Sequence, residues 1–214
     1  MTLAVDQLSL GPIGTNCYLV RSGAAATEAV VIDPGADAGS ILTRIEQLGG
    51  ACEAILLTHC HFDHFGALAE LAGATGAPVW LPELELDVFR RPDDYFPGFA
   101  VPPYEGEATL LSGGETVEAA GIAFRVTHVP GHSRGHLAYS ADGSLFSGDV
   151  LFSRSIGRTD LPSGDAEALI ESIRSLADAY PPQTVVHPGH GPATTLGEEL
   201  AANPFLVELR SLGR

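Results

Sequence analysis

The sequence has few basic residues and few cysteines. The chain has no lysine, and its eleven arginines stand against 27 aspartates and glutamates, which gives a formal net charge of −16. A surface of that sign repels a phosphate backbone, so we expect no nucleic-acid partner. The three cysteines, Cys17, Cys52 and Cys60, form no C-x-x-C pair and are odd in number. Because this does not suit a disulfide framework, we expect a reducing, cytoplasmic location.

Long apolar runs are also missing. Nowhere do 18 apolar residues occur together, and the first ten residues lack a basic stretch followed by an apolar one. We therefore expect neither a membrane span nor an export signal. With 45% hydrophobic and 18% charged residues, the composition is that of a globular protein. No repeat and no linker marks a boundary, so we expect a single domain over residues 1–214.

The apolar patterns predict strands interleaved with helices. Strands are expected over residues 3–10, 17–20, 29–32, 54–57, 78–81, 109–111, 122–129, 137–140, 144–146 and 184–186, and helices over 37–48, 66–72, 165–179 and 196–209. The segment 91–105 is rich in proline and aromatic residues and has no periodicity. It predicts a long surface loop, either a functional lid or a packed Ω-loop with no role in binding.

All eight histidines fall in three short windows. The windows hold His59, His61 and His64; His128, His132 and His136; and His187 and His190. Imidazole is the commonest metal ligand in proteins, so this clustering favours a metal site over isolated surface or core histidines.

The first window reads THCHFDH over residues 58–64, directly after a predicted strand. Residues two apart on an extended segment project the same way, so His59 and His61 can reach one ion together. If the backbone then turns into a helix, Asp63 and His64 face elsewhere, toward a second ion or a water. Cys60 alternates away from its neighbours and is interpreted as a packed small hydrophobe.

The other two windows each offer one exposed candidate. Glycines flank the turn that presents His132, and His190 lies between glycines. His136 opens the next strand and is interpreted as structural or as a residue that orients a ligand. His128, within a strand, and His187 are interpreted as structural.

Two aspartates complete the pattern. Asp149 ends an apolar run, where a carboxylate is costly to bury without a cation. Asp33 has the same setting, although an ordinary turn aspartate is an equal alternative. Each of these groups lies where a strand gives way to a loop, which is where α/β sheets build their sites.

These motifs resemble the metallo-β-lactamase superfamily. In chain order they are Asp33, the THCHFDH run at 58–64, His132, Asp149 and His190. Several co-linear motifs are more specific than any single one. Within the superfamily, residues 147–165 and the stretch from HPGHGP at 187–192 to Asn-Pro-Phe-Leu at 203–206 resemble short bacterial members of the glyoxalase II, or hydroxyacylglutathione hydrolase, group.

The resemblance implies a layered α/β fold, the αββα sandwich, with a two-metal site at one edge. His59, His61 and His132 would hold one ion, Asp63, His64 and His190 the other, and Asp149 would bridge them. Asp33 would hydrogen-bond to a ligating histidine and orient it. Zinc is the expected metal, with iron or manganese as alternatives. Full-length glyoxalase II enzymes carry an additional C-terminal helical domain that contacts glutathione, and we expect this chain to lack it.

The implied chemistry is hydrolysis of a small-molecule thioester such as S-lactoylglutathione. Two dications that share a water lower its pKa and polarise a carbonyl, and Asp63 and Asp149 would lie at that catalytic centre. The resemblance places Arg158, and Arg154 near it, as substrate-binding residues, with Arg158 as a carboxylate anchor. The alternative is that both arginines are solvated or salt-bridged charges.

Three other functions remain open from the sequence. A persulfide dioxygenase, which resembles the same branch and uses one iron, shares the Gly-Arg-Thr-Asp stretch at 157–160. The HPGHGP motif and the complete second ligand set argue against it. A lactonase would use the same activated water on an ester. A non-catalytic metal-dependent binding module is disfavoured because such a module would have lost ligands. The oligomeric state is left open.

Overall fold

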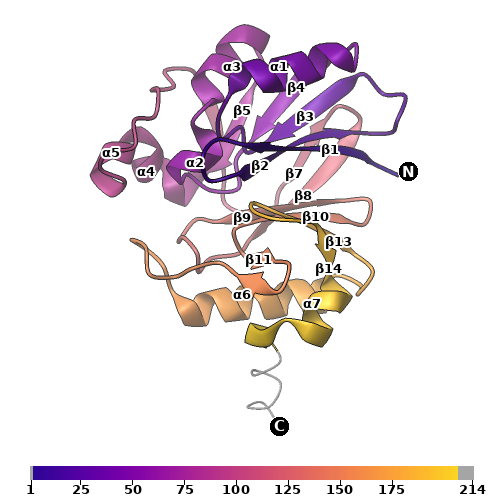
Figure 1. The fold of residues 1–214 in the computed structure, drawn as a ribbon, viewed down its shortest axis with the longest axis vertical. Helices are drawn as coiled ribbons and strands as arrows, with labels where there is room; N and C mark the ends of the chain where they lie inside the picture. The colour runs from indigo at the N-terminus through magenta and orange to yellow at the C-terminus, as the bar shows by residue number, and fades with distance from the viewer. Residues whose placement is uncertain (1, 207–214) are drawn as a thin grey trace.

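The structure, a computed structural model, describes residues 2–206. Two β-sheets pack face to face, and helices cover the outer face of each (Figure 1). None of the described helices is long and apolar enough to cross a membrane.

The first sheet is built by the N-terminal half of the chain. Its strands, in spatial order, are β1 (Ala4–Leu10), β2 (Thr15–Arg21), β3 (Glu28–Ile32), β4 (Ala51–Leu56), β5 (Val79–Pro82) and β6 (Ala108–Leu111). The first three strands are antiparallel, and β3 to β6 run parallel. Helices α1 (Ala38–Gln47) and α3 (Leu68–Thr75) lie on its outer face (Figure 1).

The second sheet is built by the C-terminal half. Its spatial order is β14 (Thr194–Thr195), β13 (Val185–Pro188), β10 (Ser144–Gly148), β9 (Leu137–Ala141), β8 (Ile122–His128) and β7 (Thr116–Ala119). β10 and β13 run parallel, and the other pairs are antiparallel. Helices α6 (Ala166–Ala179) and α7 (Leu196–Ala202) cover it, and β11 (Leu151–Phe152) pairs with β12 (Ser155–Ile156) beside it.

Alternating side chains divide the apolar residues into three cores. In β2, Cys17 and Leu19 face the helices α1 and α3, whereas Tyr18 and Val20 face the second sheet. A third core lies between the second sheet and α6 and α7, with Leu169 of α6 at its centre. Three cores separate four layers, so the αββα sandwich expected from the sequence is confirmed.

The long elements agree with the sequence expectations, and the short ones differ. The helix α2 (Phe62–Phe65) precedes α3, and the loop expected over 91–105 contains α5 (Pro92–Tyr95) just after η1 (Glu83–Glu85) and α4 (Leu86–Arg90). These helices have three to five residues, too few to show a helical period. The last helix, expected over 196–209, is interrupted: α7 ends at Ala202, residues 204–206 are again helical after Asn203, and residues 207–209 lie outside the described part of the chain.

Candidate metal centre

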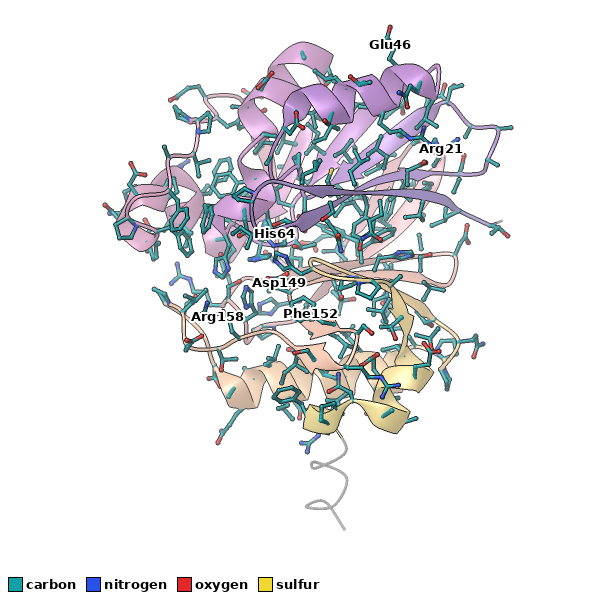
Figure 2. The ribbon with its side chains drawn as sticks, in the orientation of Figure 1. Arg21, Glu46, His64, Asp149, Phe152 and Arg158 are labelled. Atoms are coloured by element: carbon teal, nitrogen blue, oxygen red, sulfur yellow. The ribbon has the colours of Figure 1, made fainter. Side chains whose placement is uncertain are left out.

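The candidate ligands follow the carboxyl ends of strands from both sheets. The 58–64 segment follows β4, His132 follows β8, Asp149 follows β10 and His190 follows β13. These ends meet at one edge of the sandwich. Figure 2 shows His64 and Asp149 close together between the two halves of the molecule.

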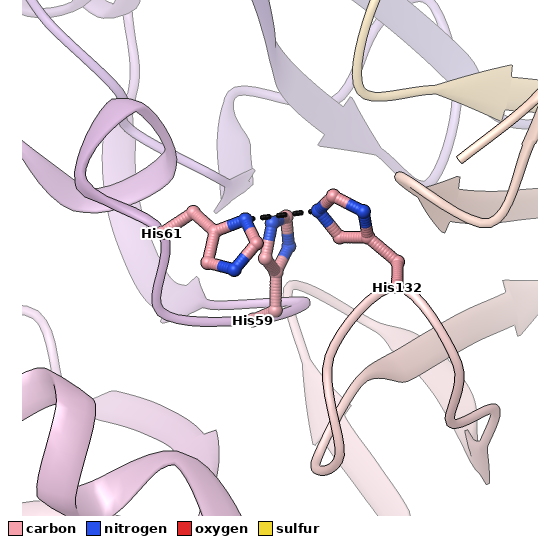
Figure 3. Close-up of side chains that lie close together, drawn as sticks. All are labelled: His59, His61 and His132. Atoms are coloured by element: carbon pink, nitrogen blue, oxygen red, sulfur yellow. Dashed lines mark hydrogen bonds between the residues drawn. The ribbon is translucent and has the colours of Figure 1, made fainter. Parts of the chain in front are cut away.

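His59 and His61 lie on the extended stretch between β4 and α2, and His61 is the N-cap residue of α2. His59 is fully buried, and its Nδ1 lies 3.0 Å from the Thr58 hydroxyl. The rings of His59, His61 and His132 converge, and His61 Nδ1 lies 2.9 Å from His132 Nε2 (Figure 3). The structure thus brings His59 and His61 together at one place, and their role as ligands of one ion stays a prediction.

Asp33 anchors this segment from the end of β3. Its carboxylate accepts hydrogen bonds from the Thr58 backbone N–H at 2.8 Å and from the Thr58 hydroxyl at 2.7 Å. It also lies 2.9 Å from His64 Nδ1. An N–H at Nδ1 that donates to Asp33 leaves the Nε2 lone pair of His64 facing the site. The geometry thus matches the orienting role that the resemblance implied for Asp33.

His132 is oriented in the same way by a backbone carbonyl. Its Nδ1 lies 2.8 Å from the Arg158 carbonyl oxygen, so the N–H there donates and Nε2 faces His61. The loop that carries His132 packs directly against α6. A Cβ on Gly131 would lie 2.3 Å from the Leu169 backbone of that helix. Only glycine fits between the His132 loop and that helix.

Asp149 is held by its backbone and by close glycines. Its N–H donates to Nε2 of the buried His136 at 3.0 Å. A Cβ on Gly189 would lie 2.1 Å from Asp149 Oδ1, and one on Gly157 would lie 1.9 Å from the Asp149 carbonyl oxygen. Backbone from two separate loops therefore packs directly against this residue. His136, which the sequence left undecided, positions Asp149.

Asp63 and His190 complete the arrangement at its more exposed side. The Thr15 hydroxyl donates to Asp63 at 2.6 Å, and His190 Nε2 lies 3.4 Å from the same carboxylate oxygen. His190 Nε2 also lies 3.5 Å from Asp149 Oδ2. A β-bridge here joins Thr15, at the start of β2 in the first sheet, to His190, on the loop after β13 of the second sheet.

The candidate side chains form three overlapping groups whose donor atoms lie within 4.8 Å of one another. The groups are His59, His61 and His132; His59, His64 and Asp149; and Asp63, His64 and His190. Every candidate ligand from the sequence belongs to one of them, and Asp149 falls in the group that links the other two.

Unpartnered polar atoms point to what this cluster holds. Within the described residues, His59 Nε2, His64 Nε2 and Asp149 Oδ1 are buried and make no hydrogen bond of ordinary geometry, although His64 Nε2 lies 3.4 Å from Asp149 Oδ1. Burying such atoms without a partner is costly, and imidazole nitrogens with carboxylate oxygens are a donor set suited to zinc, iron or manganese. The residues present therefore fit divalent metal ions.

The electrostatics of the cluster differ among its histidines. Despite burial, hydrogen bonds and charge from Asp149 and Asp63 raise the pKa of His190 to about 9. Likewise despite burial, the facing carboxylates of Asp63, Asp149 and Asp33 hold the pKa of His64 well above its usual range.

Burial raises the pKa of Asp149, but facing His64 and His190 outweigh burial and hold that pKa well below its usual range. Burial lowers the pKa of His61 to about 3, reinforced by the neighbouring His132 and His64. Burial likewise lowers the pKa of His59. Asp149 is thus ionised near neutral pH, and both imidazoles keep a free lone pair.

A pocket of about 570 Å³ opens beside the cluster. It reaches His61, Asp63, His132, Asp149 and His190, and its other walls are mainly apolar. Phe96 and Phe99, from the segment expected to form a lid or a packed loop, line it. That segment is thus part of the pocket wall, and its movement stays a prediction.

The two arginines predicted to bind substrate lie in different surroundings. Arg158 lines the pocket, and its guanidinium makes a bidentate pair with Asp160 at 2.7 and 2.8 Å. Arg154 does not line it. Its Nη1 donates to the Ala202 carbonyl at 3.2 Å, and its backbone N–H donates to Glu199. The position of Arg154 therefore does not support its predicted contact with substrate.

Three other sequence interpretations can be compared with the structure. Cys60 is buried in the core beneath α1 and α3, as expected. His128 lies outside the cluster, with Nε2 2.9 Å from the Arg134 carbonyl. His187 also lies outside it and stacks on Phe146. Thr15 was missed, because a lone threonine in β2 carries no sequence signal that it contacts a residue 48 positions away.

Comparisons with known proteins agree with this geometry. The family model of the Metallo-beta-lactamase superfamily matches residues 10–192. Hydroxyacylglutathione hydrolase GloC of Haemophilus influenzae is 36% identical over 197 residues, which cover 89% of this chain and 92% of that protein.

Two solved structures share the fold closely. The BLEG-1 B3 metallo-beta-lactamase superposes with a TM-score of 0.89 at 38% identity, covering 95% of this chain and 99% of that one. TTHA1623 in a di-iron-bound form superposes with a TM-score of 0.85 at 43% identity, covering 94% and 100%. With the matching family model and the His/Asp cluster at the sheet edge, these similarities show that the chain belongs to the metallo-beta-lactamase superfamily of metallohydrolases.

Proposed function

We propose that this chain hydrolyses a small-molecule thioester at a site for two divalent metal ions. The observation that carries the proposal is the linked arrangement of ligand groups, with Asp149 between them, at the floor of a pocket. The similarity to a hydroxyacylglutathione hydrolase supports the thioester class. The similarity to a di-iron form supports two ions and makes iron an alternative to zinc, the metal we propose.

We assign the ligands as the resemblance implied. His59, His61 and His132 would hold one ion, Asp63, His64 and His190 the other, and Asp149 would bridge them. When bound, such ions lower the pKa of a water and polarise a carbonyl oxygen.

The protein's own groups prepare the site for this chemistry. Asp33, Thr58 and the Arg158 carbonyl fix the rings of His64, His59 and His132, respectively. The carboxylates of Asp63 and Asp149 stay ionised and accept hydrogen bonds from a water or substrate group that enters. A thiolate leaves with little need for a general acid, because an ordinary thiol has a pKa of about 8.5.

Metal analysis and a thioester assay test the proposal together. Protein purified without chelator should hold near two equivalents of metal per chain by elemental mass spectrometry, and should hydrolyse S-lactoylglutathione. One equivalent of iron with oxygen consumption on a persulfide would favour the dioxygenase instead. Two equivalents with cleavage of lactones but not thioesters would favour the lactonase.

Ligand variants tie the activity to the cluster. His61→Ala and Asp149→Ala should each lower bound metal, and should lower kcat/KM by more than the roughly 10- to 100-fold typical of residues that only orient a ligand. His128→Ala is the matched control, because that histidine lies outside the cluster. Full activity in either ligand variant would refute the site.

A further inference from the structure

The pocket beside the metal cluster has two apolar walls. Ile13, Phe62, Phe96 and Phe99 come from the N-terminal half, and Phe152, Ile156 and Leu161 come from the C-terminal half. At about 570 Å³ the pocket is far larger than a short acyl group needs and falls in the range of pockets that bind drug-sized ligands.

Aromatic rings continue the walls up to the ligands themselves. Phe96 contacts the ring of His61 edge-on, with centroids 4.9 Å apart, and Phe62 stacks on Phe99 at 4.0 Å. On the opposite side Phe152 lies 6.0 Å from the ring of His190. A substrate whose carbonyl reaches the metal cluster must therefore place its neighbouring atoms against apolar surface.

Part of this apolar surface is open to solvent. Ile13 is 51% exposed and Phe99 is 50% exposed. Large apolar side chains that remain exposed at the rim of a pocket favour a ligand that covers them. Because these exposed side chains line the same pocket as the His/Asp cluster, the occupant that fits is the substrate itself.

The charges of the pocket argue against recognition by carboxylates. Among the described lining residues the one arginine is Arg158, and the lining has no lysine. Asp160 already pairs with both edges of that guanidinium. Asp63 and Asp149 also line the pocket, but as metal ligands they would have their charge offset by the ions. What limits the attraction is therefore the pair of Arg158 with Asp160 and the net charge of −16 over the whole chain. An anionic thiol carrier therefore gains little attraction here.

We infer that the pocket selects thioesters by a bulky apolar substituent, and that it gives no advantage to an anionic thiol carrier. This inference rests on the proposed thioesterase function. It concerns only which thioester the site prefers.

Four thioesters test separately whether the site prefers a bulky apolar acyl group and whether it prefers an anionic thiol carrier. They combine an acetyl or a phenylacetyl group with glutathione, which is anionic, or with N-acetylcysteamine, which is uncharged. The metal-loaded full-length protein is assayed on each, and kcat/KM is corrected for the rate of hydrolysis by hydroxide alone. Phenylacetyl should exceed acetyl by about tenfold or more on either thiol, because each buried methylene contributes a large factor. Glutathione should exceed N-acetylcysteamine by no more than about threefold.

A pair of variants locates the preference in the pocket. Phe99→Ala should lower the phenylacetyl-to-acetyl ratio by about threefold or more, because it removes one aromatic face. Phe205→Ala is the matched control, since Phe205 is also 50% exposed and does not line the pocket. Thermal melting of both variants checks that they fold.

Each outcome has a separate meaning. Three results would overturn the inference and leave the thioesterase function standing. They are equal kcat/KM values for acetyl and phenylacetyl thioesters, a tenfold or larger advantage for glutathione, and an unchanged phenylacetyl-to-acetyl ratio in Phe99→Ala. If the metal-loaded protein hydrolyses none of the four, the proposed function itself fails, and the inference fails with it.

Discussion

The ion pair between Arg158 and Asp160 limits what Arg158 can bind. Arg158 lies at the pocket, as an anchor for a carboxylate should, yet its guanidinium is already satisfied. The hydrogen bonds to Arg158 lower the pKa of Asp160 to about 2, so Asp160 is ionised near neutral pH. A substrate carboxylate would have to displace it.

Removing the charge of Asp160 should release this arginine. We expect Asp160→Asn to lower KM for a glutathione thioester by about two- to fivefold, the range of exposed ion pairs, and to leave KM for the N-acetylcysteamine thioester unchanged. Steady-state kinetics measures both. The double variant with Arg158→Ala should lose the gain. If it keeps the gain, Arg158 is not a carboxylate contact.

Asp6 should make stability depend on pH. Burial raises its pKa, but hydrogen bonds and charge from Arg44 and Arg21 outweigh burial, so the pKa lies below the usual 3.8. A lowered pKa means that the stabilisation is present above the unfolded value and is lost as the pH falls through the folded value. Asp6→Asn should therefore cost about 1–2 kcal/mol at pH 7.

Urea denaturation between pH 7 and pH 3 measures this dependence. The difference between wild type and Asp6→Asn should be constant at neutral pH and should begin to shrink as the pH falls below 3.8, because the carboxyl is then protonated first in the unfolded chain. Asp93→Asn, at an exposed aspartate of α5, is the control. A difference that stays constant across this range would show that the ion pairs of Asp6 contribute nothing.

At the scale of elements, helix α7 holds the β11–β12 hairpin through a buried carboxylate. Glu199 is fully buried and accepts hydrogen bonds from the Arg154 N–H at 2.8 Å, the Thr194 hydroxyl at 2.7 Å and the Asn203 amide at 2.8 Å. Asn203 in turn donates to the Ser155 carbonyl at 3.0 Å. This network positions the hairpin that carries Phe152 and Ile156 into the pocket.

Deleting that carboxylate should destabilise the fold. Glu199→Ala leaves several buried donors without an acceptor, and we expect a loss of about 3 kcal/mol in the free energy of unfolding. Chemical denaturation measures it. Glu46, which is exposed on α1, provides the control variant Glu46→Ala with little change. Equal effects of the two substitutions would mean that the network does not stabilise the hairpin.

Sequence patterns predicted those elements whose partners are close in the chain. The periodic apolar residues of α1 and the N-cap Asp165 of α6 are local signals, and both helices begin close to where expected. The candidate ligands were found because they cluster or follow strands. The hydrogen bond from Asp149 to His136, and the role of Asn203 in fixing the hairpin, depend on packing of distant segments. No pattern in the sequence specifies such contacts.

At the scale of the whole molecule, the two sheets contribute different ligands to one cluster. His59, His61, Asp63 and His64 belong to the first half, and His132, Asp149 and His190 to the second. Ions bound there would connect the halves and bind only the folded state, so their binding free energy adds to stability.

Removing metal should therefore lower the melting temperature. We expect a decrease of about 5–10 °C on chelation, which corresponds to roughly 2.7 kcal/mol at 100-fold saturation in a chain of this size. Differential scanning calorimetry measures it, and added zinc should restore the original value. In His61→Ala the effect of the chelator should be much smaller. An unchanged melting temperature would show that the metal does not connect the two halves.

The candidate ligands are spread along the chain, so the last of them is synthesised near its end. The ligand His190 lies on the loop after β13, and its β-bridge to Thr15 joins opposite ends of the chain. A nascent chain whose second sheet has not packed offers an ion only the local donors of 59–64. The complete set of donors exists only once the sandwich has closed, so we expect ions to bind the folded chain more tightly than its unpacked first half.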